Sequence, residues 1–256
     1  MNRIEDYLEL KLNIVEWISE YANTNKIKSL VVGVSGGIDS AVVATLCAET
    51  GIPTYVLSMP LHSKVDSDRL SNDYCKALEE KYDNVTRVRV ELSGVYEKFH
   101  HSLNWWTESK TYTTNELANA NTKSRLRMVT LYQIAGTVDG IVVGTGNKVE
   151  DYGIGFYTKY GDGGVDIAPI ADLYKTEVWE LGKSLGVDSR IIEAKPTDGL
   201  WDDGRNDEDQ LGASYEDLEY AMEHGTGPAV RVLHDFNTQN KHKMIPIPTF
   251  KLESKV

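Results

Sequence analysis

Residues 28–40 read KSLVVGVSGGIDS, and this stretch decides the fold. The apolar run Leu30–Val34 is typical of a buried strand. The glycine pair that follows permits a tight turn that a Cβ atom would hinder. A helix is predicted at Asp39–Glu49, directly after the turn. Strand, glycine turn and helix in this order predict the first half of a βαβ unit.

The alternation of strands and helices continues along the chain. Further strands are predicted at Thr54–Met59, Val85–Leu92 and 140–144, and further helices at 4–22, Asp66–Lys81, Asn115–Ala135, Lys175–Leu185, Tyr215–Glu223 and Gly227–Phe236. Strands separated by helices imply parallel pairing with right-handed crossovers. We therefore expect one doubly wound α/β domain over residues 1–256, with a parallel sheet of about five strands flanked by helices.

The composition is that of a globular protein with an excess of acidic residues. The 256 residues include 27 Lys and Arg against 39 Asp and Glu, a formal net charge of −12. This excess speaks against nucleic-acid binding, which needs a basic patch. No apolar run approaches the ~18 residues of a membrane span, and the first residues lack the pattern of a signal peptide. We expect a cytoplasmic protein that binds neither nucleic acid nor membrane, and its only cysteines, Cys47 and Cys75, are expected in helix cores.

Three loops are expected at one rim of the sheet, because the carboxyl ends of parallel strands meet there. They are residues 35–40, 58–62 and 144–150. In the first loop, backbone N–H groups and the hydroxyls of Ser35 and Ser40 can surround a phosphate. Asp39 has the wrong charge for a phosphate, and Mg²⁺ between the two would resolve the conflict. The alternative is an ordinary turn capped by Asp39 or Ser35.

SGGIDS resembles the pyrophosphate loop of the ATP pyrophosphatases, and it differs from the Walker loop because no Lys follows the glycines. Further blocks follow: NTKSRLRM (121–128), GTGNKVE (144–150), FYTKYGDGGVD (156–166), DLYKTEV (172–178), PTDGLW (196–201), DEDQLG (207–212) and His242-Lys243. In this order they resemble the NAD synthetase family over about residues 4–250. The resemblance implies an adenine nucleotide alpha-hydrolase-like fold and a ligase activity. That activity is ATP-dependent amidation of deamido-NAD (nicotinate adenine dinucleotide) by ammonia to NAD, through an acyl-adenylate, with release of AMP and pyrophosphate.

The resemblance also assigns roles to single residues. Catalytic roles fall to Asp39, Lys175 and Thr197, and Mg²⁺ would be held by Asp39 and Glu150. Asp151 is the alternative metal ligand, because the stretch after Glu150 is longer than the family pattern. The co-substrate ATP would contact Gly33, Val34, Ser35, Gly36, Gly37, Ile38, Asp39, Ser40, Thr145, Lys175 and Thr197. Deamido-NAD would contact Arg125, Lys159, Asp162, Asp166, His242 and Lys243, with Arg127 left to a structural role.

Glutamine-using members of the family carry a further amidase domain, for which these blocks leave no room, so the ammonia-dependent form is implied. The resemblance implies a homodimer with deamido-NAD bound across the subunit interface. Residues 197–210 are expected to close over the phosphates. Ser58-Met59-Pro60 stands where the family usually has an Arg that contacts adenine. Open alternatives are another ATP pyrophosphatase, such as an XMP amidase or a tRNA thiolase, and a nucleotide sensor without turnover. A separate glutaminase that supplies the ammonia also stays open.

Overall fold

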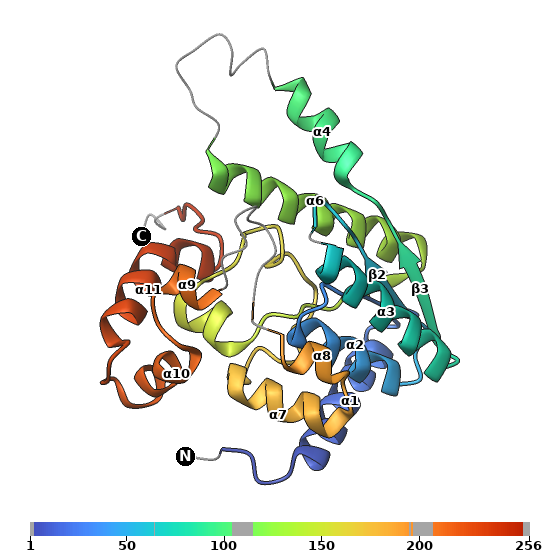
Figure 1. Ribbon diagram of the computed structural model, residues 1–256, viewed down its shortest axis with the longest axis horizontal. Coiled ribbons are helices and arrows are strands. Elements are labelled where there is room, and N and C mark those ends of the chain that lie inside the picture. The colour runs from blue at the N-terminus through green and yellow to red at the C-terminus, as the bar shows by residue number, and fades with distance from the viewer. Residues whose placement is uncertain (1–2, 64, 104–114, 195, 197–206, 253–256) are drawn as a thin grey trace.

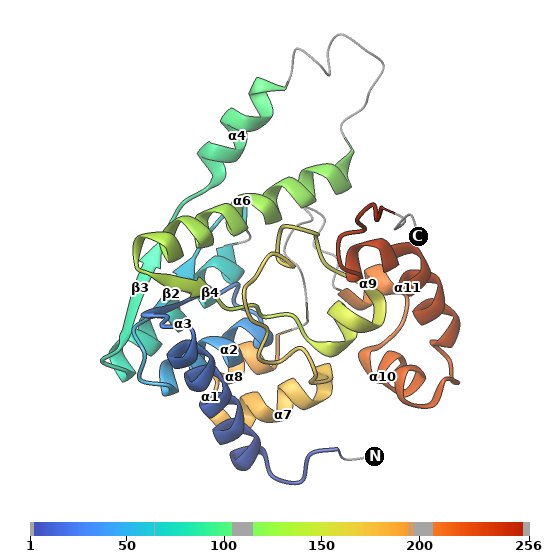
Figure 2. The ribbon, with the colours of Figure 1, turned by 180° about the vertical axis from the view of Figure 1, so that it is seen from behind.

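A parallel four-stranded sheet in the order β3-β2-β1-β4 forms the centre of the molecule (Figures 1 and 2). The computed structural model describes residues 3–63, 65–103, 115–194, 196 and 207–252. The strands are β1 (Ser29–Gly33), β2 (Thr54–Ser58), β3 (Val85–Arg89) and β4 (Gly140–Val142). Leu30 of β1 is in register with Thr54 on one side and Ile141 on the other. The predicted doubly wound α/β class is confirmed.

Helices occupy both faces of this sheet. They are α1 (Tyr7–Thr24), α2 (Ile38–Glu49), α3 (Val65–Lys81), α4 (Ser93–Ser102), α6 (Glu116–Thr137), α7 (Lys175–Leu185), α8 (Ser189–Ile192), α9 (Asp207–Leu211), α10 (Tyr215–His224) and α11 (Val230–Met244). A π-helix, η1 (Val149–Ile154), follows β4. The sequence did not predict α4, α8, α9 or η1. None of the helices within the described ranges has the length and apolar character that a membrane span requires.

Successive residues of β1 point to opposite layers, as the twofold periodicity of a strand requires. Leu30 and Val32 pack into the layer formed by α1, α2, α3, α7 and α8. Val31 packs into the opposite layer, against α6 and α4. Both faces of β1 are covered by helices, which explains why its sequence is an unbroken apolar run and does not alternate with polar residues. Cys47 and Cys75 are buried in the first layer, as predicted.

The described residues form four strands where about five were expected. The fifth position, beside β4, is held by a single parallel bridge between Val143 and Ile167. The Gly144 N–H donates to the carbonyl oxygen of Ile167 at 2.7 Å. Pro169 follows two residues later, and proline has no N–H with which to continue a ladder. The pairing therefore stops after one bridge.

The connections reverse direction between β1 and β4. The chain moves from β1 through α2 to β2 and through α3 to β3, then returns past α6 to β4 on the other side of β1. Such a reversal is the topological switch point at which open α/β sheets bind ligands. The loops after β1 and β4 lie at this point. Helices α9, α10 and α11 lie at the end of the molecule away from β3, where α10 and α11 pack against η1 (Figure 1).

Candidate active site

The turn after β1 has a shape that requires glycine at position 36. Gly36 has φ of +91°, a conformation that side chains disfavour. A Cβ atom there would lie 3.0 Å from the carbonyl oxygen of Ser67 and 3.2 Å from the backbone nitrogen of Ser71. The chain of α3 thus closes in on the turn from one side. Only glycine accommodates both the dihedral angle and the neighbouring backbone.

Two serine side chains hold the turn in place. The Ser40 hydroxyl accepts from the Ser35 N–H at 3.1 Å and donates to the Gly37 carbonyl at 2.9 Å. The Ser35 hydroxyl accepts from the Gly37 N–H at 3.2 Å. Gly37 is the N-cap of α2, so the positive end of the helix dipole opens at the turn. The predicted ATP-contacting run, residues 33–40, is this turn, and its geometry is suited to an anion.

Lys175 stands between two carboxylates that come from distant parts of the chain. Its Nζ lies 2.5 Å from Oδ2 of Asp39 and 3.0 Å from Oε1 of Glu150, and its side chain is 3 % exposed. Lys175 begins α7, where the positive end of the helix dipole disfavours a cation. Burial lowers the pKa of Lys175, but the attraction of Asp39 and Glu150 outweighs burial and raises it, so the ammonium stays charged.

The two carboxylates respond differently to the same surroundings. Burial raises the pKa of Asp39 against the attraction of Lys175, and the negative charge of Glu150 adds to the effect. Burial acts on Glu150 too, but the Lys175 charge and the hydroxyl of Tyr215 outweigh it and lower its pKa. Glu150 is therefore the carboxylate that keeps its charge most firmly, although Lys175 pairs with both.

Asn147 joins this cluster, and the sequence analysis gave it no role. Its side-chain amide donates to Oδ1 of Asp39 at 3.2 Å. Its Oδ1 accepts from the backbone N–H groups of Val149 and Glu150 at 3.0 and 3.1 Å, which caps the start of η1. The side chain is completely buried. It fixes the turn after β1 relative to the helix that carries Glu150. Its place within the GTGNKVE block was the only signal.

The Asp151 carboxylate lies against Gly146, on the loop after β4. A Cβ on Gly146 would collide with both oxygens of the Asp151 carboxylate, so this carboxylate lies directly over the glycine. Burial raises the pKa of Asp151 to about 8, and the charges of Glu150, Asp162 and Asp39 contribute. Of Glu150 and Asp151, Glu150 is the carboxylate that shares the Lys175 ammonium with Asp39.

The chemistry of this donor set fits Mg²⁺. Mg²⁺ prefers oxygen ligands and is usually held by one or two carboxylates together with substrate phosphates and water. Asp39 and Glu150 supply two such carboxylates, and the space between them holds a cation, the Lys175 ammonium. Over the described ranges, no group of three or more His, Cys, Asp or Glu side chains is arranged to hold a metal. The two carboxylates are suited to an ion that shares its remaining positions with phosphate.

Most of the residues assigned to the second substrate come together around the loop after η1. The Arg125 guanidinium donates to the Lys159 carbonyl from Nε and from Nη2, each at 3.3 Å. The Lys159 ammonium donates to the carbonyl of His242 at 3.4 Å. The Lys243 ammonium donates to the carbonyls of Gly155 and Tyr157 at 2.7 and 2.8 Å. Side chains from α6 and α11 thus converge on this loop.

The two aspartates of the same block are bound to backbone. Asp162 accepts from the Ser124 hydroxyl at 2.7 Å and from the Thr158 N–H at 3.0 Å, which shapes the glycine turn. Asp166 accepts from the Val142 N–H at 2.8 Å and from the Tyr132 hydroxyl at 3.1 Å, beside β4.

The remaining predicted residues lie on the loops of the site or outside the described ranges. Thr145 is partly exposed on the loop after β4. Arg127 donates to the Met59 carbonyl at 3.2 Å, in keeping with the structural role expected for it. Thr197 lies outside the described residues, as does most of the segment expected to close over the phosphates.

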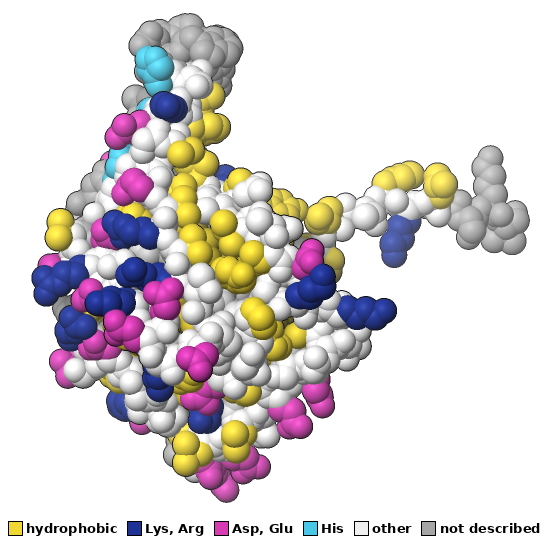
Figure 3. Space-filling model, turned by 90° about the vertical axis from the view of Figure 1, so that its right-hand side faces the viewer, with side chains coloured by type: hydrophobic (Ala, Val, Ile, Leu, Met, Phe, Trp, Pro, Cys, Tyr) yellow, Lys and Arg dark blue, Asp and Glu magenta, His cyan; other side chains and the backbone are white. Residues whose placement is uncertain are grey.

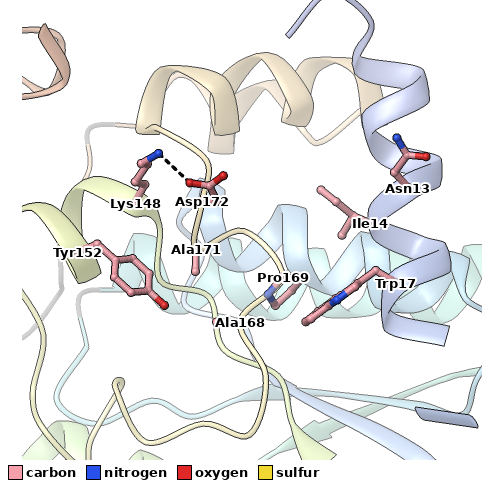
Figure 4. Close-up of a pocket in the computed structure, with 9 residues that line it drawn as sticks. All are labelled: Asn13, Ile14, Trp17, Lys148, Tyr152, Ala168, Pro169, Ala171 and Asp172. Carbon is pink, nitrogen blue, oxygen red and sulfur yellow. Dashed lines mark hydrogen bonds and ion pairs between the residues drawn. The ribbon is translucent and has the colours of Figure 1, made fainter. Parts of the chain in front are cut away.

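A cavity of about 460 Å³ lies beside the site (Figure 4). Residues of α1, among them Trp17, line one side of the cavity. The other side is lined by Lys148, Tyr152, Ala168, Pro169, Ala171 and Asp172. Lys148 and Asp172 form an ion pair of 2.7 Å at its edge. The lining is mostly apolar and includes neither Asp39 nor Glu150. The ion-pair cluster of Asp39, Glu150 and Lys175 therefore does not line this cavity.

Comparison with known proteins identifies the family of this chain. Residues 10–245 match the family model described as NAD synthase. The chain is 37 % identical over 243 residues to the NH(3)-dependent NAD(+) synthetase of Carboxydothermus hydrogenoformans, covering 92 % of this chain and 95 % of the relative. It is 35 % identical over 260 residues to that of Methanosarcina acetivorans, covering 95 % and 98 %. The structure of NMN synthetase from Francisella tularensis superposes with a TM-score of 0.85 at 32 % identity, covering 97 % of this chain and 100 % of that one. This chain therefore belongs to the NAD synthase family.

Proposed function

We propose that the protein is an ammonia-dependent ligase that amidates deamido-NAD to NAD and converts ATP to AMP and pyrophosphate. The observation that carries the proposal is that Asp39, at the end of the glycine turn after β1, shares the Lys175 ammonium with Glu150. The chain that holds this ion-pair cluster is related over nearly its full length to ammonia-dependent NAD synthetases. The cluster comprises Asp39, Glu150 and Lys175 and lies where nucleotides bind in such sheets.

The reaction must activate a carboxylate, which is a poor electrophile because its oxygen leaves badly and its charge repels nucleophiles. An oxygen of the nicotinate carboxylate attacks the α-phosphorus of ATP, and pyrophosphate leaves. Ammonia then attacks the carbonyl carbon of the acyl-adenylate, AMP leaves, and the nitrogen loses a proton. Phosphoryl transfer of this kind depends on positioning and charge stabilisation, so no covalent enzyme intermediate is needed.

The chain's own groups suit this task. The turn at residues 33–40 would bind the phosphates through N–H groups and serine hydroxyls. Lys175, with Thr145 and Thr197, would contact ATP. Asp39 and Glu150 would hold Mg²⁺, which when bound neutralises phosphate charge. The Lys175 ammonium is already paired with these two carboxylates, and a bound triphosphate would offer it a third anionic partner.

The second substrate carries a pyrophosphate and a carboxylate, and the chain offers a group of cations for them. We assign its binding to Arg125, Lys159, Asp162, Asp166, His242 and Lys243, and the convergence of α6 and α11 on the loop after η1 supports this. Cations and hydrogen-bond donors gathered from several elements are suited to a substrate with two phosphates.

We further propose a single catalytic domain that forms a homodimer. Hydrophobic side chains gather on the face shown in Figure 3. On α6, Val129 is 57 % exposed and Tyr132 is 36 % exposed. Exposed apolar surface of this kind is typical of an interface between subunits. A cytoplasmic location fits an enzyme that consumes ATP.

A second candidate substrate is nicotinate mononucleotide. The structural match to an NMN synthetase, at 32 % identity over nearly the whole of both chains, favours this substrate as the alternative to deamido-NAD. Both reactions act on the same carboxylate and would need the same adenylation site. They differ in whether the substrate carries an AMP half.

The test supplies purified protein with ATP, Mg²⁺ and ammonium chloride, and with either deamido-NAD or nicotinate mononucleotide. Chromatography follows NAD, NMN and pyrophosphate. We expect NAD to appear one-for-one with pyrophosphate, and Asp39→Ala to abolish both. NMN alone would establish the second candidate. Pyrophosphate without amide would point to a missing nitrogen donor such as a glutaminase subunit. In a parallel reaction that supplies XMP instead, formation of GMP would favour another member of the ATP pyrophosphatases. A separate titration that shows nucleotide binding, with no product in any reaction, would favour the sensor.

A further inference from the structure

We propose that Tyr215 is a positioning residue that holds Glu150 in the orientation in which it binds Mg²⁺. The inference rests on the proposed function for the identity of the metal–nucleotide complex. Tyr215 is absent from the sequence blocks that carry the family resemblance, and it lies 65 residues from Glu150 along the chain. Its hydroxyl nonetheless lies within the Lys175 ion-pair cluster.

The ring of Tyr215 is held rigidly. Tyr215 begins α10 and is completely buried. Its ring meets that of Trp179 edge to face, with centroids 6.1 Å apart at 82°. It packs in the apolar cluster that joins α10 to η1, together with Val149 and Leu218. A ring fixed by packing on several sides places its hydroxyl at a defined point.

The hydroxyl donates to the metal-binding carboxylate. Tyr215 Oη lies 2.7 Å from Oε1 of Glu150 and 3.2 Å from Oδ2 of Asp207. A phenol has a single proton to donate, so the shorter distance assigns the bond to Glu150. Nζ of Lys175 lies over the face of the same ring, 5.0 Å from the ring centroid. The Tyr215 side chain therefore contacts both partners of the Lys175–Glu150 ion pair.

This arrangement matters most when nucleotide is bound. Oε1 of Glu150 accepts from two donors, Lys175 and Tyr215. If Lys175 turns toward a phosphate, the tyrosine hydroxyl remains to hold Oε1, and Oε2 can face the ion. Hydrogen bonds from surrounding residues to a ligating carboxylate orient it in this way, and their loss typically weakens metal binding about 10–100-fold.

The test compares Tyr215→Phe with Tyr74→Phe. Phenylalanine keeps the ring and removes only the hydroxyl. Tyr74 is a matched control because it is buried and its hydroxyl is hydrogen-bonded at 2.6 Å, but to Thr45 in the layer between α2 and α3. Binding of Mn²⁺, a paramagnetic substitute for Mg²⁺, is measured by electron paramagnetic resonance in the presence of α,β-methylene-ATP. In this analogue a methylene group replaces the oxygen between the α- and β-phosphorus atoms, so the bond that the reaction would break cannot be cleaved. Thermal unfolding of each variant confirms that it is folded.

We expect Tyr215→Phe to weaken Mn²⁺ binding about 10-fold or more and to raise the Mg²⁺ concentration for half-maximal turnover, with the KM for ATP at saturating Mg²⁺ within about twofold of wild type. Tyr74→Phe should lower thermal stability and leave metal binding unchanged. Equal Mn²⁺ affinity in wild type and Tyr215→Phe overturns the inference, as does wild-type protein that binds no Mn²⁺ with the analogue. The metal measurement needs no turnover, so wild type that binds Mn²⁺ but forms neither NAD nor NMN would refute the proposed function alone.

Discussion

Replacing Lys175 by methionine should turn the centre of the site into a source of instability. The methionine keeps most of the stem but leaves Asp39 and Glu150 facing each other without a cation. Their side chains are only 16 % and 17 % exposed, so water cannot fully replace the ammonium. Breaking a buried ion pair by removing one partner typically costs about 3–5 kcal/mol of unfolding free energy. For a chain of this size each kcal/mol shifts Tm by about 2–4 °C, so a fall of about 6–20 °C is expected near pH 8.

The sign of the pH dependence follows from the same geometry. Without Lys175, burial and mutual repulsion hold the pKa values of Asp39 and Glu150 above those of the unfolded chain. The folded variant then binds more protons than the unfolded chain, so its stability falls as pH rises through these raised values. Relative to wild type, the deficit in Tm should be largest at high pH and should shrink on acidification.

Calorimetry of Mg²⁺-free and nucleotide-free protein at about pH 8 and about pH 5.5 measures both effects. Lys183→Met is the matched control, because Lys183 lies on the same helix and pairs with Glu180 at 2.6 Å, but its side chain is 54 % exposed. An exposed pair of this kind contributes at most about 1 kcal/mol. The reasoning would be refuted if the two variants lost equal stability, or if the Lys175→Met deficit grew on acidification.

Other parts of the structure give further tests. Gly36→Ala should cost at least about 1–2 kcal/mol in urea unfolding and weaken binding of an ATP analogue, because φ is +91° and the Ser67 carbonyl is close; an unchanged midpoint and affinity would contradict this. Asn147→Ala should lower the free energy of unfolding by about 0.5–2 kcal/mol, as loss of a helix cap does, and an unaltered Tm would argue against the capping role. Burial raises the pKa of Cys75 to about 12, so the thiol stays protonated at about pH 8, and Cys47 is equally covered. Both should react with a disulfide reagent only after unfolding, and rapid labelling of native protein would exclude the buried arrangement.

The parts of the fold that the sequence predicted well are those with a strong local signal. The strand and turn at residues 28–40 combine an apolar run, paired glycines and a helix start, and the structure has β1 and α2 there. Lys175–Leu185 was predicted with the bounds that α7 has. In both places the periodicity of apolar residues changes sharply at the end of the element.

The missed elements lack such a signal. The π-helix η1 is six residues long and ends at Ile154, so it is too short for a repeat of its wide turn to show in the sequence. Its start depends on Asn147, whose amide also donates to Asp39 in the first turn of α2. A fifth strand was expected, but Pro169 ends pairing after one bridge. These features depend on tertiary contacts and on single residues rather than on a pattern.

The candidate site divides in the same way. Asp39, Glu150 and Lys175 were assigned from a family resemblance, and the structure brings them within hydrogen-bonding distance. Tyr215 was predicted only as the first residue of a helix, Tyr215–Glu223. Packing alone explains its ring, and only the three-dimensional position of its hydroxyl reveals a second role.

The charges of the site explain how a protein of net charge −12 could bind two polyanionic substrates. Asp39 and Glu150 pair with the Lys175 ammonium, and the charge of Asp207 also acts on it, so this cluster by itself would repel a triphosphate. Under the proposed function, a divalent ion on Asp39 and Glu150 removes that repulsion and frees Lys175 to neutralise phosphate. Attraction of this kind acts at short range within a buried cluster and is little screened by salt. We therefore expect ATP binding to depend steeply on Mg²⁺ and only weakly on ionic strength, which a titration of an ATP analogue at two salt concentrations would measure. A strong salt dependence without a Mg²⁺ requirement would instead place the phosphates against exposed cations elsewhere on the surface.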